Sequence, residues 1–189
     1  YIMNSKDLRA IEHLDELWGA GVESFKIEGR TKSIYYLSLI TKAYRQAIDA
    51  MIAKKPFNPK LLDETEKTAN RGFTTAFLLS ASERATEKFD SPQEENLPQI
   101  YAGKVVNQRA GGWMEVEIKN RIKVGHEIEY ISPQNNYRFQ ISAMEGESGL
   151  ALQLAHGGNG TVWIKTEGPI DPYALLSRVV DLPVSSSVS

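Results

Sequence analysis

The sequence predicts a two-part α+β chain, and two observations support that class. Up to about residue 80, short alternating apolar segments are followed by longer segments with apolar residues at helical spacing. This strand–helix–strand–helix order is typical of a parallel sheet. After Pro98 the apolar period shortens to alternation and turn residues separate the segments, which favours a small antiparallel β-barrel, closed or nearly closed.

The first part begins with apolar residues. Residues 1–4 (YIMN) look like the end of a strand, so we expect the chain to begin inside a larger fold. Ser5 is a suitable N-cap, and apolar residues from Leu8 to Trp18 recur at helical spacing, which predicts the first helix. Residues 23–28 alternate and predict a strand.

Ser33 is placed to cap a second helix, which we expect to end near Lys54, Lys55 and Pro56. A third, more polar helix is expected over residues 59–69. We assign residues 1–80 to this βαβα part. Two such units cannot close a parallel sheet or cover both of its faces, so the first part lacks packing partners.

Residues 81–97 are polar and lack periodicity, which predicts a linker. Residues 98–182 form the predicted barrel, with Trp113 and Trp163 as core aromatics. The serine-rich residues 183–189 are expected to be disordered. The strands of the barrel are predicted at residues 101–106, 113–118, 126–131, 137–144, 150–154 and 161–164.

Composition excludes several classes of function. The formal net charge is −2 and is spread evenly, so a nucleic-acid partner would have to bind a local basic patch. The chain has no cysteine, which excludes disulfides, thiolate metal sites and cysteine nucleophiles within it. No apolar run approaches the length that spans a bilayer and no signal peptide is visible, so we expect a cytoplasmic protein.

The most informative stretch is ESFKIEGRTKS, residues 23–33. At the carboxyl end of a barrel strand, Lys26 and Glu28 would point into the lumen as a buried pair with shifted proton equilibria. The residues that follow, Arg30, Lys32 and Ser33, could bind an anion, while Gly29 would let the backbone approach a ligand. The structural alternative is an ion pair beside a capped helix.

Other polar residues extend the predicted binding surface. Ser5 and Asp7 would line the same mouth, although both also suit a helix N-terminus. Arg71 lies beside Phe73 and could stack on a base or ring, or be solvated. Three further cations in the barrel could contact phosphate or could lie in a solvated loop; they are Lys119, Arg121 and Lys123.

Several motifs resemble the carboxyl-terminal part of the collagenase-like peptidase family. They are YIMNSKDLRAIEHL, GVESFKIEGRTKSIYYLSLITKAYRQAID, KPFNP and NRGFTTAFL. The later segments GKVV and MEVEIKNRIKVGHEIEYISP are similar to the family's small carboxyl-terminal barrel, which is like the barrels of translation factors. The resemblance covers the whole chain and is strongest to the family branch that hydroxylates tRNA.

The resemblance implies that residues 1–80 are the remnant of a TIM-type barrel, with its last two strands in residues 1–28. It implies a parent enzyme that acts on tRNA and makes 5-hydroxyuridine at the wobble position with prephenate. Our leading hypothesis places Lys26, Glu28 and Arg30 at the mouth of that barrel as the catalytic residues. The resemblance also implies an iron–sulfur cluster held by cysteines outside this chain, which itself would hold no cofactor and would be inactive alone.

Two rival functions follow from the same sequence. One is proteolysis of collagen-like chains, although no nucleophile–base set or metal motif is visible in these residues. The other is a binding module, in which the barrel docks tRNA or a protein. We also expect self-association, because an open barrel edge exposes apolar faces and unpaired strands.

Overall fold

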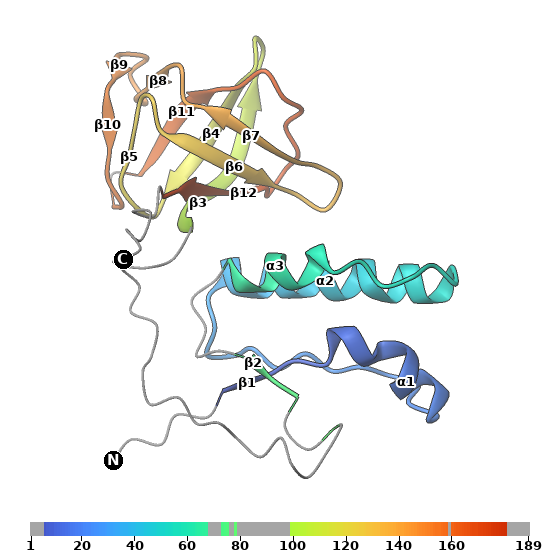
Figure 1. The fold of residues 1–189 in the computed structure, drawn as a ribbon. Coiled ribbons are helices and arrows are strands. Elements are labelled where there is room, and N and C mark those ends of the chain that lie inside the picture. The colour runs from blue at the N-terminus through green and yellow to red at the C-terminus, as the bar shows by residue number, and fades with distance from the viewer. Residues whose placement is uncertain (1–5, 68–72, 76–77, 79–98, 159, 181–189) are drawn as a thin grey trace, which may run out of the picture. The chain divides into compact units, whose positions relative to one another are not determined.

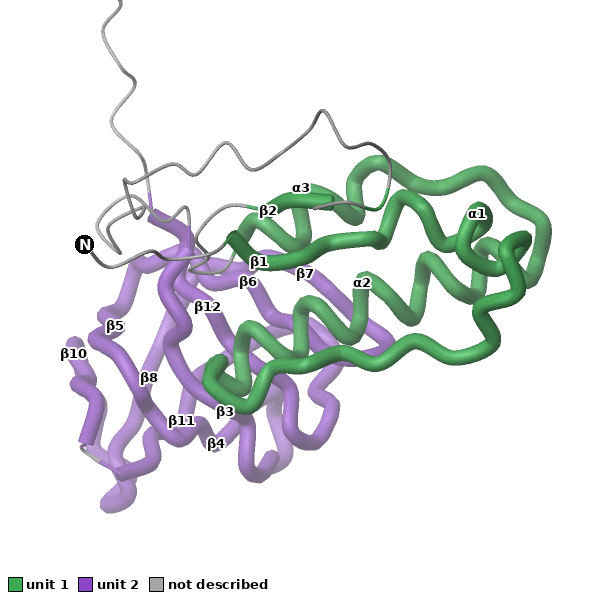
Figure 2. The backbone as a smooth tube through the Cα atoms, turned by 90° about the horizontal axis from the view of Figure 1, so that it is seen from below, with its two compact units in different colours: residues 1–97 green, residues 98–189 purple. Residues whose placement is uncertain are grey.

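The computed structural model describes residues 6–67, 73–75, 78, 99–158 and 160–180. The chain divides into two compact units, residues 1–97 and 98–189, which are coloured separately in Figure 2. Each unit is described by itself. The predicted linker (residues 81–97) and tail (residues 183–189) lie outside the described residues, as do residues 1–4 of the expected first strand.

The described residues of unit 1 form three helices, a short 3₁₀ turn and a small parallel sheet (Figure 1). Strand β1 pairs with β2 in parallel, with Asp7 opposite Phe73 and Leu8 opposite Thr74. Parallel pairing is the arrangement that the strand–helix order of the sequence predicts. The elements are β1 (Asp7–Leu8), η1 (Ile11–His13), α1 (Leu14–Gly19), α2 (Ile34–Ile52), α3 (Lys60–Glu66) and β2 (Phe73–Thr74).

Two predicted elements of unit 1 are wrong. Asp7 and Leu8 belong to β1 and not to a helix, because their backbone pairs with β2 and the Arg9 N–H donates to the Thr74 carbonyl at 2.9 Å. Residues 23–28 form no ladder with any described residue. Of their apolar side chains, Phe25 packs against the core of unit 1, whereas Ile27 is 37% exposed.

The long helix α2 is predicted correctly. The Ser33 hydroxyl accepts a hydrogen bond from the Tyr36 N–H at 3.1 Å and caps the helix, which ends at Ile52. Its apolar face packs on η1, α1 and α3. The buried cluster between them contains Ile11, Leu14, Ala43, Ala47 and Leu61.

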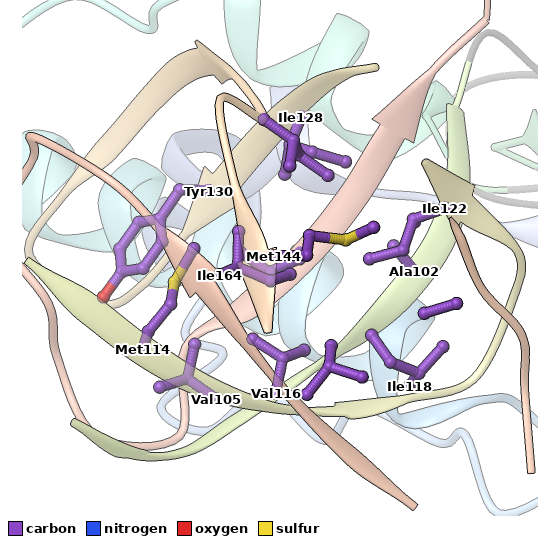
Figure 3. Close-up of a cluster of buried hydrophobic side chains, with 14 of the residues drawn as sticks. Ala102, Val105, Met114, Val116, Ile118, Ile122, Ile128, Tyr130, Met144 and Ile164 are labelled. Atoms are coloured by element: carbon purple, nitrogen blue, oxygen red, sulfur yellow. The ribbon is translucent and has the colours of Figure 1, made fainter. Parts of the chain in front are cut away.

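Unit 2 is a curled antiparallel sheet around one core (Figures 1 and 3). Its eight strands follow the order β7-β6-β12-β3-β4-β11-β8-β9, and β5 pairs separately with β10. Figure 3 shows Val116, Met144 and Ile164 pointing into the space that the curled sheet encloses. The strands are β3 (Gln99–Arg109), β4 (Trp113–Ile118), β5 (Ile122–Lys123), β6 (Glu127–Ile131), β7 (Asn136–Gln140), β8 (Met144–Glu145), β9 (Ala151–Leu152), β10 (Leu154–Ala155), β11 (Thr161–Lys165) and β12 (Leu175–Val179).

Of the two predicted forms, closed or nearly closed, the fully closed barrel is wrong, because the sheet ends at β7 and β9, with no ladder between them in the described residues. Only residues 141–143 connect β7 to β8. Their backbone groups bond to the neighbouring strands: the Ile141 N–H donates to the His126 carbonyl at 3.0 Å, and the Lys165 N–H donates to the Ala143 carbonyl at 3.1 Å. These two bonds continue the registers of the β6–β7 and β11–β8 ladders by one residue pair each.

Candidate functional site

The three predicted catalytic residues lie together in the segment between α1 and α2. The Lys26 ammonium is 3.6 Å from a carboxylate oxygen of Glu28, and the backbone N–H of Arg30 donates to the other oxygen at 3.3 Å. These contacts are local, because they join residues two positions apart. The segment therefore brings the Lys26 ammonium, the Glu28 carboxylate and the Arg30 backbone N–H together in one small polar cluster.

The expectation of a buried Lys26–Glu28 pair is wrong. The side chains of Lys26 and Glu28 are 85% and 63% exposed, because the segment pairs with no described strand and has no lumen to point into. The role expected for Gly29 also changes. Gly29 is buried, and a Cβ built on it would lie 2.2 Å from a methyl group of Leu37, so its missing side chain lets the backbone approach α2.

Lys32 forms a second cluster, with Asp7 and Tyr36. Its ammonium lies 2.6 and 2.9 Å from the two carboxylate oxygens of Asp7, and the Tyr36 hydroxyl donates to the same carboxylate at 3.2 Å. Burial, the Asp7 charge and this hydrogen bond raise the pKa of Tyr36 above its usual range. Asp7 and Lys32 thus tie β1 to the turn before α2, and Ser33 beside them caps that helix.

In unit 2 the predicted binding cations separate into two environments. Lys119 lies 2.5 Å from Glu117, and the nearby cations Lys119 and Lys104 lower the pKa of that carboxyl group. Arg121 and Lys123 are exposed, and Ile122 between them is fully buried. Because side chains alternate along an extended chain, Arg121 and Lys123 share the outward face.

Two residues that the sequence did not single out join this pair. The Arg178 guanidinium on β12 donates to the Arg121 carbonyl at 3.5 Å. Burial and the charges of Arg178, Lys123 and Arg121 lower the pKa of His126. We call these four residues, Arg121, Lys123, His126 and Arg178, the basic corner. No sequence spacing indicates it, because Arg178 comes from a distant strand.

The predicted placement of two tryptophans in the core is also wrong. Trp113 and Trp163 alternate with the buried Met114 and Ile164, so they lie half-buried on the outer face of the sheet. The Arg109 guanidinium lies between their rings, 4.8 Å from one centroid and 4.5 Å from the other.

The remaining predicted contacts, Ser5 and Arg71, lie outside the described residues. Iron–sulfur clusters are held by cysteine thiolates, and a chain without cysteine does not fit that role. Within the described residues, no group of three or more metal-ligating side chains comes together, and no helix is long and apolar enough to cross a membrane.

Fold and site together define a two-unit α+β chain with polar clusters at the loops of unit 1 and a cationic corner on a curled β-sheet. The chain belongs to peptidase family U32. The pattern of that family matches residues 1–88, and the pattern of its C-terminal domain matches residues 98–177.

Two curated relatives and one solved structure illustrate the similarity. The chain is 40% identical to tRNA hydroxylation protein P of Escherichia coli and 37% identical to that of Haemophilus influenzae, over 94% of its own length in each case. It spans 40% and 39% of those proteins, respectively. The C-terminal domain of a Geobacillus thermoleovorans U32 peptidase aligns with 41% of this chain and 90% of its own, at 26% identity and a TM-score of 0.40.

Proposed function

We propose that the chain is the carboxyl-terminal part of a cytoplasmic enzyme that hydroxylates the wobble uridine of tRNA to 5-hydroxyuridine with prephenate. The observation that carries the proposal is the 40% identity to a tRNA hydroxylation protein over 94% of the chain. In this proposal residues 1–80 complete a TIM-type barrel whose other strands belong to the rest of the enzyme. The iron–sulfur cluster also belongs to that part, and the chain alone is inactive.

Lys26, Glu28 and Arg30 are the residues we place next to the substrate. Their segment is exposed, and Lys26 and Glu28 contact each other locally, so the polar groups are available to a ligand. Cationic side chains can bind carboxylate or phosphate groups through charge-assisted hydrogen bonds. Glu28 supplies the acceptor that orients Lys26 and the turn at Arg30.

The test is substitution in the intact parent enzyme. Glu28→Gln and Arg30→Gln are expected to reduce 5-hydroxyuridine in tRNA strongly, as measured by mass spectrometry of digested tRNA. The matched control is Arg45→Gln, which removes a cation from another exposed ion pair of unit 1, that with Asp49 at 2.5 Å. Unchanged hydroxyuridine in both loop variants would contradict the assignment of these residues.

A peptidase is the second candidate, and the observation that favours it is the family to which the chain belongs. If the intact parent is a peptidase, the rate at which denatured collagen is cleaved should be proportional to the concentration of the purified parent. The cleavage activity should also remain after further purification. Collagen cleavage that persists while tRNA hydroxylation is absent would favour this candidate over the first.

A further inference from the structure

We propose that the basic corner of unit 2 is a phosphate-binding site that holds the sugar–phosphate backbone of RNA. The identity of the ligand as RNA rests on the proposed function. The site itself is argued from the charges, burial and hydrogen bonds of its four residues. The site adds to the proposed function, because unit 2 would bind the backbone of the tRNA substrate away from the base that reacts.

The first argument is a contrast in charge pairing among the described lysines and arginines of unit 2. Four of the eight have a carboxylate partner: Lys104 and Lys119 with Glu117, Arg109 with Glu145, and Arg138 with Glu127 and Glu129. The other four have no carboxylate partner within the described residues: Lys165 donates to the Gly111 carbonyl, and Arg121, Lys123 and Arg178 belong to the basic corner.

The second argument is the clustering of the three corner cations, none of which has a carboxylate partner within the described residues. The three charges and His126 converge from two segments that are far apart in sequence, the region around β5 and the strand β12. Like charges at short range repel, so their convergence without a carboxylate costs stability in the free protein. An anion bound among them would relieve that repulsion, because the combined positive field of the corner attracts its negative charge.

The third argument is that the polar groups of the corner are arranged as donors. The His126 Nδ1 atom accepts a hydrogen bond from the Lys123 N–H at 3.2 Å, which leaves Nε2 as the protonated, donating nitrogen of the neutral ring. The Arg178 Nε group is buried and has no hydrogen-bond partner among the described residues. Phosphate oxygens are acceptors only, and they match a site made of donors.

The experiment measures binding of an unmodified tRNA transcript to the 189-residue chain by fluorescence anisotropy at several salt concentrations. Arg121→Gln and Lys123→Gln are on the exposed face and are expected to leave the fold intact. Each should weaken binding by roughly threefold to tenfold and reduce the slope of log affinity against log salt by about 1. Arg178→Gln should act in the same direction.

The matched control is Lys104→Gln, which removes the same charge from a lysine already near Glu117. It should change the affinity by less than any corner variant. Circular dichroism of every variant checks that the fold is retained. Unchanged affinity and salt slope in the corner variants would overturn the inference, as would absence of tRNA binding by the unaltered chain at low salt.

The two proposals can fail separately. Corner variants that bind tRNA normally would remove this inference and leave the hydroxylation proposal standing. Loop variants at Glu28 and Arg30 that still hydroxylate tRNA would contradict the proposed catalytic residues and leave a measured effect of the corner on binding intact. Binding of an acidic protein with no binding of tRNA would instead assign the corner to a protein partner.

Discussion

At the residue scale, Asp7 links β1 to the start of α2 in unit 1. It accepts from the Lys32 ammonium and the Tyr36 hydroxyl, and its side chain is only 17% exposed. The Lys32 ammonium also lies 4.7 Å from the centre of the Tyr36 ring. This arrangement gives Asp7 a structural role, whatever it contributes to substrate binding.

The substitution Asp7→Asn is expected to destabilise unit 1 by about 1–3 kcal/mol, because it removes the carboxylate that pairs with a half-buried ammonium. Urea unfolding of the chain, followed by the amide signals of α2, measures the change. Asp49→Asn, at an exposed ion pair, should cost less than about 0.5 kcal/mol. Equal effects of the two substitutions would show that the Asp7 contacts add little.

His126 predicts a pH dependence of stability. Its pKa is lowered in the folded chain, so the unfolded chain takes up the proton first as the pH falls through about 6.5. The His126 contribution to stability is therefore complete above that pH and is lost progressively below it. In His126→Gln the loss of stability between pH 8 and pH 5.5 should be smaller, as measured by urea unfolding. An identical loss in both proteins would contradict this assignment.

At the scale of the element, β12 holds the sheet of unit 2 together. It pairs with β3 on one side and with β6 on the other, and it places Leu176 in the core with no exposed surface. The strand follows Tyr173, which has a positive φ of 64°. No alternating pattern marks β12, because the residues Leu175, Leu176 and Ser177 are all buried.

Leu176→Ala should therefore destabilise unit 2 by about 2–5 kcal/mol, since it removes buried atoms and leaves a cavity between two ladders. Urea unfolding followed by the amide signals of β3 and β6 measures the effect. Leu150→Ala is the control, because that side chain is 70% exposed and should cost under about 0.5 kcal/mol. A small effect at Leu176 would mean that β12 is not an integral strand.

At the scale of the whole molecule, the chain is predicted to self-associate. Unit 1 exposes large apolar side chains, among them Leu8, Trp18, Ile34 and Ile52, at 55–67% of their surface. Its sheet has only two strands among the described residues, and such a sheet is marginal alone. Sedimentation velocity should show association that increases with concentration.

The double substitution Trp18→Lys and Ile52→Lys should shift the chain toward monomer, because it places charge on those apolar faces. Leu150→Lys in unit 2 serves as the matched control and should leave the association unchanged. A single monomeric species of the unaltered chain at every concentration would refute the prediction.

The sequence by itself determined the elements whose cause is local. Helix α2 was predicted with its cap because Ser33 and the apolar stripe that follows act within a few residues. Strand β4 was predicted over its whole length because buried and half-buried residues alternate from Trp113 to Ile118. The same local reading placed Lys26, Glu28 and Arg30 near one another.

Only the tertiary structure decided features that depend on distant partners. The alternating residues 23–28 pair with no described strand, so Lys26 and Glu28 are exposed. In unit 2, β12 is a strand because it pairs with β3 on one side and with β6 on the other. The basic corner exists because that strand carries Arg178 beside Arg121. Strand pairing and the clustering of charges depend on residues far apart in the sequence, so the spacing of residues along the chain does not predict them.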